Sequence, residues 1–214
     1  MKINSLTVLT LALCILNIGC DSEPNTTEVN DPVASNSELS KDAIFYYDRG
    51  TAYVDQGEWD KAIADYSKVI ELYPDDVGTY GMRALVYLTQ GKLDKAIADF
   101  TKIIELDPEV PAAFFNGRGS AYDRQGESEK AIADFTKAIE LDPQLTAAYN
   151  NRGEVYRLQG DLVLAIADYS KAIELNPQLA NAYHNRGVVF EKLGNKENAE
   201  ADYAKAKELG YEPE

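Results

Sequence analysis

The chain has very little of the side-chain chemistry that metal sites and most active sites require. Its 214 residues include one histidine, His184, and two cysteines, Cys14 and Cys20. A zinc site of clustered His and Cys ligands is therefore excluded. A Ser-His-Asp site would have to use His184, and nothing around it resembles a nucleophile elbow. The Gly-x-Gly at Gly117 lacks a third glycine and follows no predicted strand, so it is not a phosphate loop. We expect no cofactor, no metal ion and no enzymatic activity.

Positive charge is also scarce. The chain has 21 Lys and Arg against 36 Asp and Glu, which gives a formal net charge of −15. Nucleic-acid binding requires clustered basic residues that neutralise phosphates, and attraction to anionic lipid requires a basic face. The composition therefore argues against a nucleic-acid partner and against a basic membrane-binding face. It is compatible with a basic protein partner.

Long apolar runs are absent except for one near the start. Residues 6–18, LTVLTLALCILNI, are almost entirely apolar, but at about 1.5 Å per residue they are too short for a ~30 Å hydrocarbon core. A basic start, a short apolar run and a small residue before a break are typical of a secretory signal. The break is Gly19-Cys20. It resembles the lipobox of bacterial lipoproteins, although that family prefers Leu three residues before the Cys and this chain has Asn17.

This resemblance implies that residues 1–19 are a signal peptide and that Cys20 is lipidated. The chain would then be extracytoplasmic and anchored to a bacterial membrane, on the periplasmic side in a Gram-negative cell. Ordinary signal cleavage and an uncleaved anchor remain the alternatives. Residues 20–42 contain the lipidated Cys and a segment rich in Ser, Asn, Thr, Pro and acids, for which we expect a disordered tether.

The remainder of the chain repeats itself. The pentapeptide AIADY at Ala62 returns, with small changes, at Ala96, Ala131, Ala165 and Ala199. A dipeptide Arg-Gly, once Arg-Ala, recurs at spacings of 34, 35, 34 and 34 residues. A fixed period of this size predicts a stacked array of small units. The units are 43–76, 77–110, 112–145, 146–179 and 180–213.

Each unit contains two stretches with apolar residues three and four apart, which predicts two helices. In the first, aromatic residues at positions 4 and 11 of the unit flank a small residue at position 8. A glycine then ends the helix. The second has Ala at position 20 and an aromatic residue at position 24, so that the two backbones can approach closely. Position 8 is occupied by Gly50, Ala84, Gly119, Gly153 and Gly187.

This pattern resembles the tetratricopeptide repeat (TPR), over residues 43–213 and five units. The resemblance implies an all-α fold, a right-handed α-α superhelix or TPR solenoid of five helix-turn-helix repeats. One departure recurs, because the family usually has Leu at position 7 and this chain has Arg in every unit. Position 23 is Asp in every unit.

We interpret these Arg and Asp residues as a ladder of structural ion pairs, because a guanidinium near a helix interface needs a counter-charge. An anion site is the less favoured reading, since a binding site rarely recurs identically in each unit. The sequence leaves open whether the pairs lie within or between repeats. The residues are Arg49, Arg83, Arg118, Arg152 and Arg186 with Asp65, Asp99, Asp134, Asp168 and Asp202.

In TPR proteins the first helix of each unit lines the concave face, mainly through positions 2, 5, 9, 12 and 13. These positions are small and apolar in the first two units and polar in the last three, where Asn side chains can bond a peptide backbone. Asp123, Glu154 and Asn181 are among the polar positions. The resemblance implies a peptide-binding groove that includes Tyr47, Thr51, Val54, Leu85, Leu88, Asn116, Ser120, Asn150, Arg157 and His184.

The function that follows is a membrane-tethered TPR scaffold that binds protein or peptide segments on its concave face. It would serve as an assembly factor or adaptor in the cell envelope. A cell-wall-processing accessory enzyme and a self-associating structural array are the alternatives, and the oligomeric state is left open. The two-Lys, two-Asn, one-Arg clamp by which some TPR domains hold a C-terminal carboxylate is absent, since Tyr47 and Ala113 stand at two of its positions.

The last repeat differs from the others. Positions 21 and 28 are Ile in the first four units and become Glu200 and Lys207 in the fifth. The two positions share one stripe of the second helix, which should bury against the next unit. The charged residues therefore predict a polar outer face that ends the array.

Overall fold

The computed structural model describes residues 40–107 and 110–212, and within them it contains ten α-helices and no strand. The predicted signal peptide, Cys20 and nearly all of the predicted tether lie outside the described residues. None of the described helices is long and apolar enough to cross a membrane. Contacts divide the chain into two compact units that meet in sequence at Val110 and Pro111, and each unit is considered by itself.

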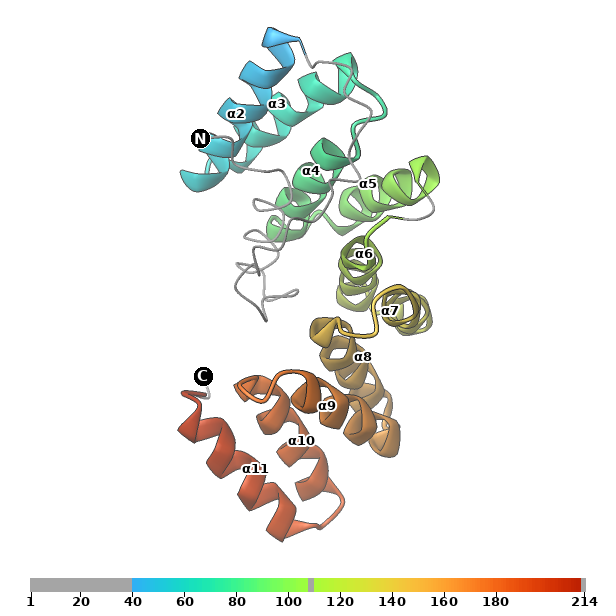
Figure 1. Cartoon of the computed structure of the whole chain (residues 1–214), viewed down its shortest axis with the longest axis vertical. Helices are drawn as coiled ribbons and strands as arrows, with labels where there is room; N and C mark the ends of the chain where they lie inside the picture. Colours follow the sequence, from blue (N-terminus) through green and yellow to red (C-terminus); the bar gives the residue numbers. More distant parts are fainter. Residues whose placement is uncertain (1–39, 108–109, 213–214) are drawn as a thin grey trace. The chain divides into compact units, whose positions relative to one another are not determined.

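Each predicted repeat contains one pair of antiparallel helices, so the all-α prediction is confirmed (Figure 1). The first unit holds two pairs: α2 (Lys41–Asp55) with α3 (Trp59–Leu72), and α4 (Val77–Thr89) with α5 (Leu93–Leu106). The second unit holds three: α6 (Ala112–Arg124) with α7 (Ser128–Leu141), α8 (Thr146–Gln159) with α9 (Leu162–Leu175), and α10 (Ala180–Lys192) with α11 (Lys196–Glu208).

Capping residues explain where the helices begin and end. The side chain of Ser40 accepts from the backbone N–H of Ala43, and α2 accordingly starts two residues before the predicted first repeat. The glycine predicted to end each first helix has a positive φ in all five repeats, between 69° and 89°. Only glycine adopts this conformation without a Cβ clash, so these predicted helix ends are confirmed.

The two helices of a pair are in close contact at position 8. A Cβ built on Gly119 would lie 2.8 Å from Cε1 of Phe135, the aromatic residue at position 24. In three other repeats a Cβ built on the glycine would lie 2.8–3.0 Å from the equivalent ring, for Gly50 with Tyr66, Gly153 with Tyr169 and Gly187 with Tyr203. The small residue at position 8 is therefore required by the packing of the ring from the second helix.

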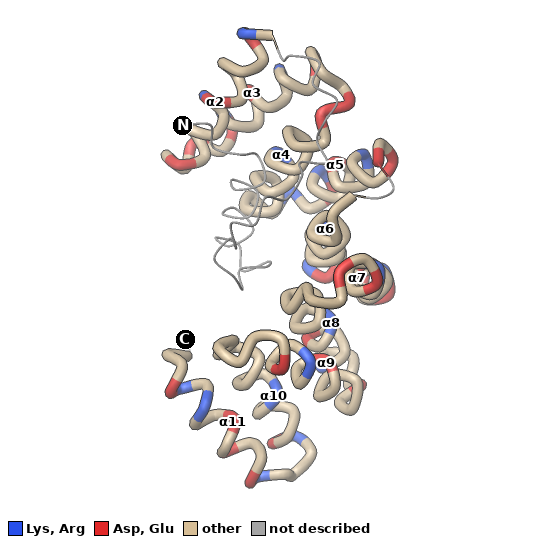
Figure 2. The backbone as a smooth tube through the Cα atoms, in the orientation of Figure 1, with Lys and Arg blue, Asp and Glu red and all other residues tan. Residues whose placement is uncertain are grey.

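Neighbouring repeats pack through the stripe that the sequence predicted. Ile132 on α7 packs with the buried Val155 of α8, and Ile166 on α9 packs with the buried Val189 of α10. On α11 the equivalent residues Glu200 and Lys207 are exposed. Charged residues run along α11 in Figure 2, whereas α4 includes only one, Arg83. The polar outer face predicted for the last repeat is present.

Candidate functional site

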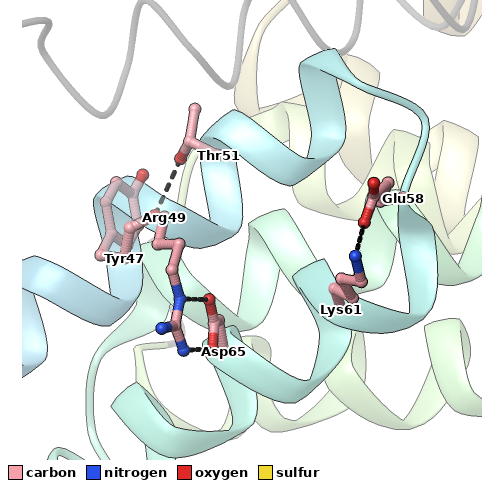
Figure 3. A network of polar contacts seen from close by, with 6 residues as sticks. All are labelled: Tyr47, Arg49, Thr51, Glu58, Lys61 and Asp65. Atoms are coloured by element: carbon pink, nitrogen blue, oxygen red, sulfur yellow. Dashed lines mark hydrogen bonds and ion pairs between the residues drawn. The ribbon is translucent and has the colours of Figure 1, made fainter.

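The ladder of position-7 arginines lies within the repeats. In the first repeat, Nε of Arg49 donates to Asp65 Oδ2 at 2.6 Å and Nη2 donates to Oδ1 at 2.7 Å (Figure 3). The other four arginines make the same two bonds at 2.7–2.9 Å. Two parallel bonds of this kind fix the guanidinium plane against the carboxylate. Each pair joins the first helix of a repeat to the second helix of the same repeat.

A third bond joins three of these arginines to the preceding repeat. Nη1 of Arg83, Arg152 and Arg186 donates to the hydroxyl at position 25 of the previous repeat, at 2.8–2.9 Å. Aromatic residues at positions 4 and 11 flank each guanidinium, with ring centroids about 6 Å away. The arginine thus replaces the usual Leu of this position and connects adjacent repeats. We regard this ladder as structural.

A separate polar network lies on α8 of the second unit. Glu154 accepts from Nε of Arg157 at 2.8 Å and from the Tyr169 hydroxyl, also at 2.8 Å. Burial by itself would raise the pKa of Glu154, but the bonds from Arg157 and Tyr169 together lower it. The carboxylate is therefore ionised and held in place at neutral pH.

The helices α6, α8 and α10 are neighbours in this unit, since Asn151 on α8 donates to Asn116 on α6 and α8 also contacts α10. Burial, and then the carboxylate of Glu154, raises the pKa of Asp123 on α6. Burial, and then the charge of Arg157, lowers the pKa of His184 on α10. These four residues belong to three different repeats. The charge of Glu154 on α8 acts on Asp123 on α6, and the charge of Arg157 on α8 acts on His184 on α10.

Two amide oxygens on this face have no hydrogen-bond partner. They are Oδ1 of Asn150 on α8 and Oδ1 of Asn181 on α10, and both atoms are buried although each residue is partly exposed. A buried acceptor without a partner is unfavourable, so a ligand donor would stabilise it once the side-chain amide turned outward. These two oxygens are the clearest unmet hydrogen-bonding groups of the described second unit.

An aromatic hollow lies at the C-terminal end of the same face. His184 stacks on Tyr211 with ring centroids 4.2 Å apart and an interplanar angle of 17°. The hollow measures about 590 Å³ and is lined by His184, Tyr203, Lys207, Gly210, Tyr211 and Glu212. Burial and a hydrogen bond to Glu191 raise the pKa of Tyr203 to about 12. This hollow could accept an apolar or aromatic side chain at one end of a bound segment.

Comparison with known proteins places this chain in a family. Tetratricopeptide repeat models match residues 47–111, 112–145, 135–167 and 180–209, and a TPR repeat model matches residues 153–194. A solved structure of MamA is 31% identical, with a TM-score of 0.69 over 75% of this chain and 93% of MamA. The chain belongs to the tetratricopeptide repeat family.

Two more distant structures share the fold of this TPR protein. MamA from Desulfovibrio magneticus RS-1 is 18% identical with a TM-score of 0.73, over 80% of this chain and 96% of that one. YrrB, described as a TPR protein with an unusual peptide-binding site, is 24% identical with a TM-score of 0.63. The YrrB match covers 79% of this chain and 87% of YrrB. No match was found among curated proteins.

The groove residues carried over from the TPR pattern lie in different environments. In the first unit of this TPR protein, Tyr47, Thr51 and Val54 are half-buried, and Leu85 and Leu88 are buried. The hydroxyl of Thr51 donates to the carbonyl of Tyr47 at 3.1 Å (Figure 3).

In the second unit Asn116 is buried and its amide oxygen accepts from Asn151 at 3.2 Å. Ser120 donates to the Asn116 carbonyl at 3.0 Å. Asn150, Arg157 and His184 are half-buried and lie on the polar face described above. The structure places Arg157 against Glu154, whose charge acts on Asp123, while the charge of Arg157 acts on His184.

One surface of this TPR protein was missed by the sequence reasoning. Leu158, Val163 and Leu164, around the turn between α8 and α9, are exposed apolar residues. At the positions of Val163 and Leu164 the other four repeats have an acid followed by Lys or Asn. This departure from the repeat's own pattern could have identified the apolar edge from the sequence.

Proposed function

We propose that this TPR protein binds an extended segment of a partner protein on the face formed by α6, α8 and α10. The observation that carries the proposal is the pair of unmet amide oxygens on Asn150 and Asn181. An extended segment offers backbone N–H groups to such acceptors, and Asn can also donate to a backbone carbonyl. The peptide-binding site of YrrB supports the use of a TPR face for this purpose.

The charges of the face indicate what the segment carries. Burial raises the pKa of Asp123, and its carboxylate forms no ion pair within the described residues, whereas Arg157 is held by Glu154. A basic side chain of the segment would therefore be stabilised next to Asp123 and Glu154. The aromatic hollow at His184 and Tyr211 would receive an apolar side chain further along.

The test is a pull-down with the full chain from solubilised membranes, in which partners are identified by mass spectrometry. Replacing Asn150 and Asn181 together with Ala should remove a specific partner while helicity by circular dichroism is unchanged. The matched control replaces Gln144 and Gln178, two exposed amides in the turns between repeats, with Ala. Equal retention of every specific partner by both double variants would contradict the proposed face.

We further infer that the protein acts at a membrane surface in the cell envelope, as an assembly factor or adaptor. The support is the sequence pattern of residues 1–20, with a short apolar run that ends at Gly19-Cys20. Cys20→Ala should move the processed protein out of the detergent phase, whereas Cys14→Ala should leave the partitioning as it is. Unchanged partitioning of a processed Cys20→Ala variant would refute the lipid anchor.

A further inference from the structure

The apolar edge between α8 and α9, formed by Leu158, Val163 and Leu164, departs from the pattern of the other repeats. Leu158 is 65% exposed, Val163 is 77% exposed and Leu164 is 48% exposed. The turn of the fifth repeat changes in the same direction, since the exposed Leu193 stands where the other four repeats have Gln. At the position of Leu158 the other four repeats have exposed polar residues, which are Asp55, Thr89, Arg124 and Lys192.

The fourth repeat lacks two local interactions because of this edge. The second helix of every other repeat has an acid in its first turn, where the helix N-terminus favours a negative charge, and α9 has Val163 there. In the first three repeats the next residue is a lysine whose Nζ lies 5.2–5.6 Å from the ring centroid of the position-11 tyrosine. In α9 that residue is Leu164. Both side chains are exposed, so packing within the repeat does not compensate for these losses, and the compensating contact is expected outside it.

The structure of the turn favours a lipid bilayer as the surface that the edge contacts. The N–H groups of Gly160, Asp161 and Leu162 each donate to a carbonyl of residues 156–160, at 2.9–3.2 Å. A turn whose backbone donors are already paired can approach acyl chains without leaving an unmet hydrogen bond. The carboxylate of Asp161 would remain among the headgroups, where the cationic group of a zwitterionic lipid offers it a counter-charge. The three aliphatic side chains also differ from the Trp, Tyr and Arg anchors of most protein interfaces, among which Leu and Val are under-represented.

The predicted N-terminal segment brings the folded part to such a surface, and this step rests on the lipid anchor proposed above. Cys20 lies 20 residues before Ser40, the N-cap of α2. A flexible chain of this length spans about 25 Å on average, so an anchored chain is held close to the bilayer. At the effective concentration that a short tether gives, an edge of three aliphatic residues can engage the surface, although by itself it would bind a vesicle only weakly.

We propose that the apolar edge inserts shallowly into the bilayer to which the chain is anchored, and that it holds the turn between α8 and α9 at the membrane surface. Leu158, Val163 and Leu164 then lie at the boundary between the headgroups and the acyl chains. The chain has a net charge of −15, so attraction to anionic lipid contributes nothing and the contact depends on the aliphatic side chains. Asn150 is eight residues from Leu158 along α8, about 12 Å, so an insertion of about 5–10 Å leaves its amide available to a bound segment.

The test places a fluorescent label at this turn in the full chain, anchored in vesicles. A processed and acylated chain has no free thiol, because its one cysteine is Cys20, so a single new cysteine can be labelled selectively. Gln159→Cys labels the end of α8 at the turn, and the matched control Gln144→Cys labels an exposed position beyond the other end of α8, about 20 Å away. In phosphatidylcholine vesicles with brominated acyl chains, which quench on contact, the Gln159→Cys label should be quenched and the Gln144→Cys label should not.

Restoring the residues of the other repeats completes the experiment. Val163→Glu/Leu164→Lys gives α9 the Glu-Lys pair of the third repeat and should abolish the quenching, while helicity by circular dichroism is unchanged. The control Leu141→Ala removes an exposed apolar side chain at the end of α7 and should leave the quenching as it is. A chain that sediments with the vesicles but whose Gln159→Cys label is not quenched would overturn the insertion, leaving the anchor intact and a protein contact as the role of the edge. Quenching that persists in the double variant would overturn the insertion as well, and a chain that fails to sediment with the vesicles would refute both the anchor and the insertion.

Discussion

Removing one carboxylate from the arginine ladder tests whether these pairs stabilise the array. In the fourth repeat, Arg152 donates to both oxygens of Asp168 at 2.8 Å and to Thr136 Oγ1 at 2.9 Å. The Arg152 side chain is only 16% exposed and that of Asp168 is 8% exposed. Asp168→Ala leaves the guanidinium in place with one hydroxyl and two flanking rings, but without its counter-charge.

The expected loss follows from this partial burial. Breaking a buried ion pair by removing one partner costs about 3–5 kcal/mol, and the residual exposure of Arg152 places this pair near the lower end. With a urea dependence of about 2 kcal/mol/M, a loss of about 3 kcal/mol lowers the urea midpoint by about 1.5 M. In the same repeat, the exposed pair of Lys171 with Glu174 is worth much less, about 0.5 kcal/mol, so Glu174→Ala is the matched control.

The decisive variant removes both charges. Arg152→Leu/Asp168→Leu fills the space with apolar groups and leaves no buried charge, so it should lose less than about 1 kcal/mol. Urea unfolding followed by circular dichroism compares the three variants. If the double variant is as destabilised as Asp168→Ala, then an uncompensated guanidinium is not the cause and the interpretation of the ladder is wrong.

Three further predictions follow from the packing, the charges and the end of the array. Gly119→Ala places a Cβ 2.8 Å from a buried ring and should cost about 1–3 kcal/mol in urea unfolding, whereas Gly78→Ala, where the Cβ would make only an ordinary contact at 3.7 Å with Asp76, should be neutral or slightly stabilising. The pKa of Asp123 is raised above 3.8, so its contribution to the stability of the fold is present below pH 3.8 and is lost as the pH rises through the raised pKa. Asp123→Asn should therefore have a higher Tm than the wild type at pH 7, and the same Tm below about pH 3.8. Glu200→Ile/Lys207→Ile should expose an apolar stripe and cause association by sedimentation with unchanged helical content, and a double variant that behaves as the wild type would contradict the role of these charges.

Most of the fold could be predicted because each repeat contains the residues that determine its local structure. Gly at the end of the first helix, a small residue at position 8 and an aromatic residue at position 24 each have one physical reading. The five copies then agree with one another, which removes the ambiguity that a single copy would have. The predicted helix pairs, their glycine ends and the polar outer face of α11 were all accessible in this way.

Whether each arginine pairs with the aspartate of its own repeat or of a neighbouring one could not be predicted, and the reason is geometric. Arg83 lies sixteen residues from Asp99 in its own repeat and sixteen residues from Ser67 in the preceding one. Sequence separation cannot distinguish these two directions, and the structure shows that the arginine uses both. The sequence could not predict which residues of the candidate site are accessible either, since Asn116 and Asn150 share position 5 yet only Asn116 is fully buried.

The two ends of the array differ in a way that follows from the ladder. Three repeats receive a bond from the next arginine through the hydroxyl at position 25, which belongs to Ser67, Thr136 or Ser170. The last repeat has Ala204 there and charged residues on its outer stripe, so it neither accepts such a bond nor offers an apolar surface. The first repeat keeps Arg49 with an unused donor and an exposed Phe45. The C-terminal end is thus closed to further stacking, whereas the stacking stripe of α2 is exposed.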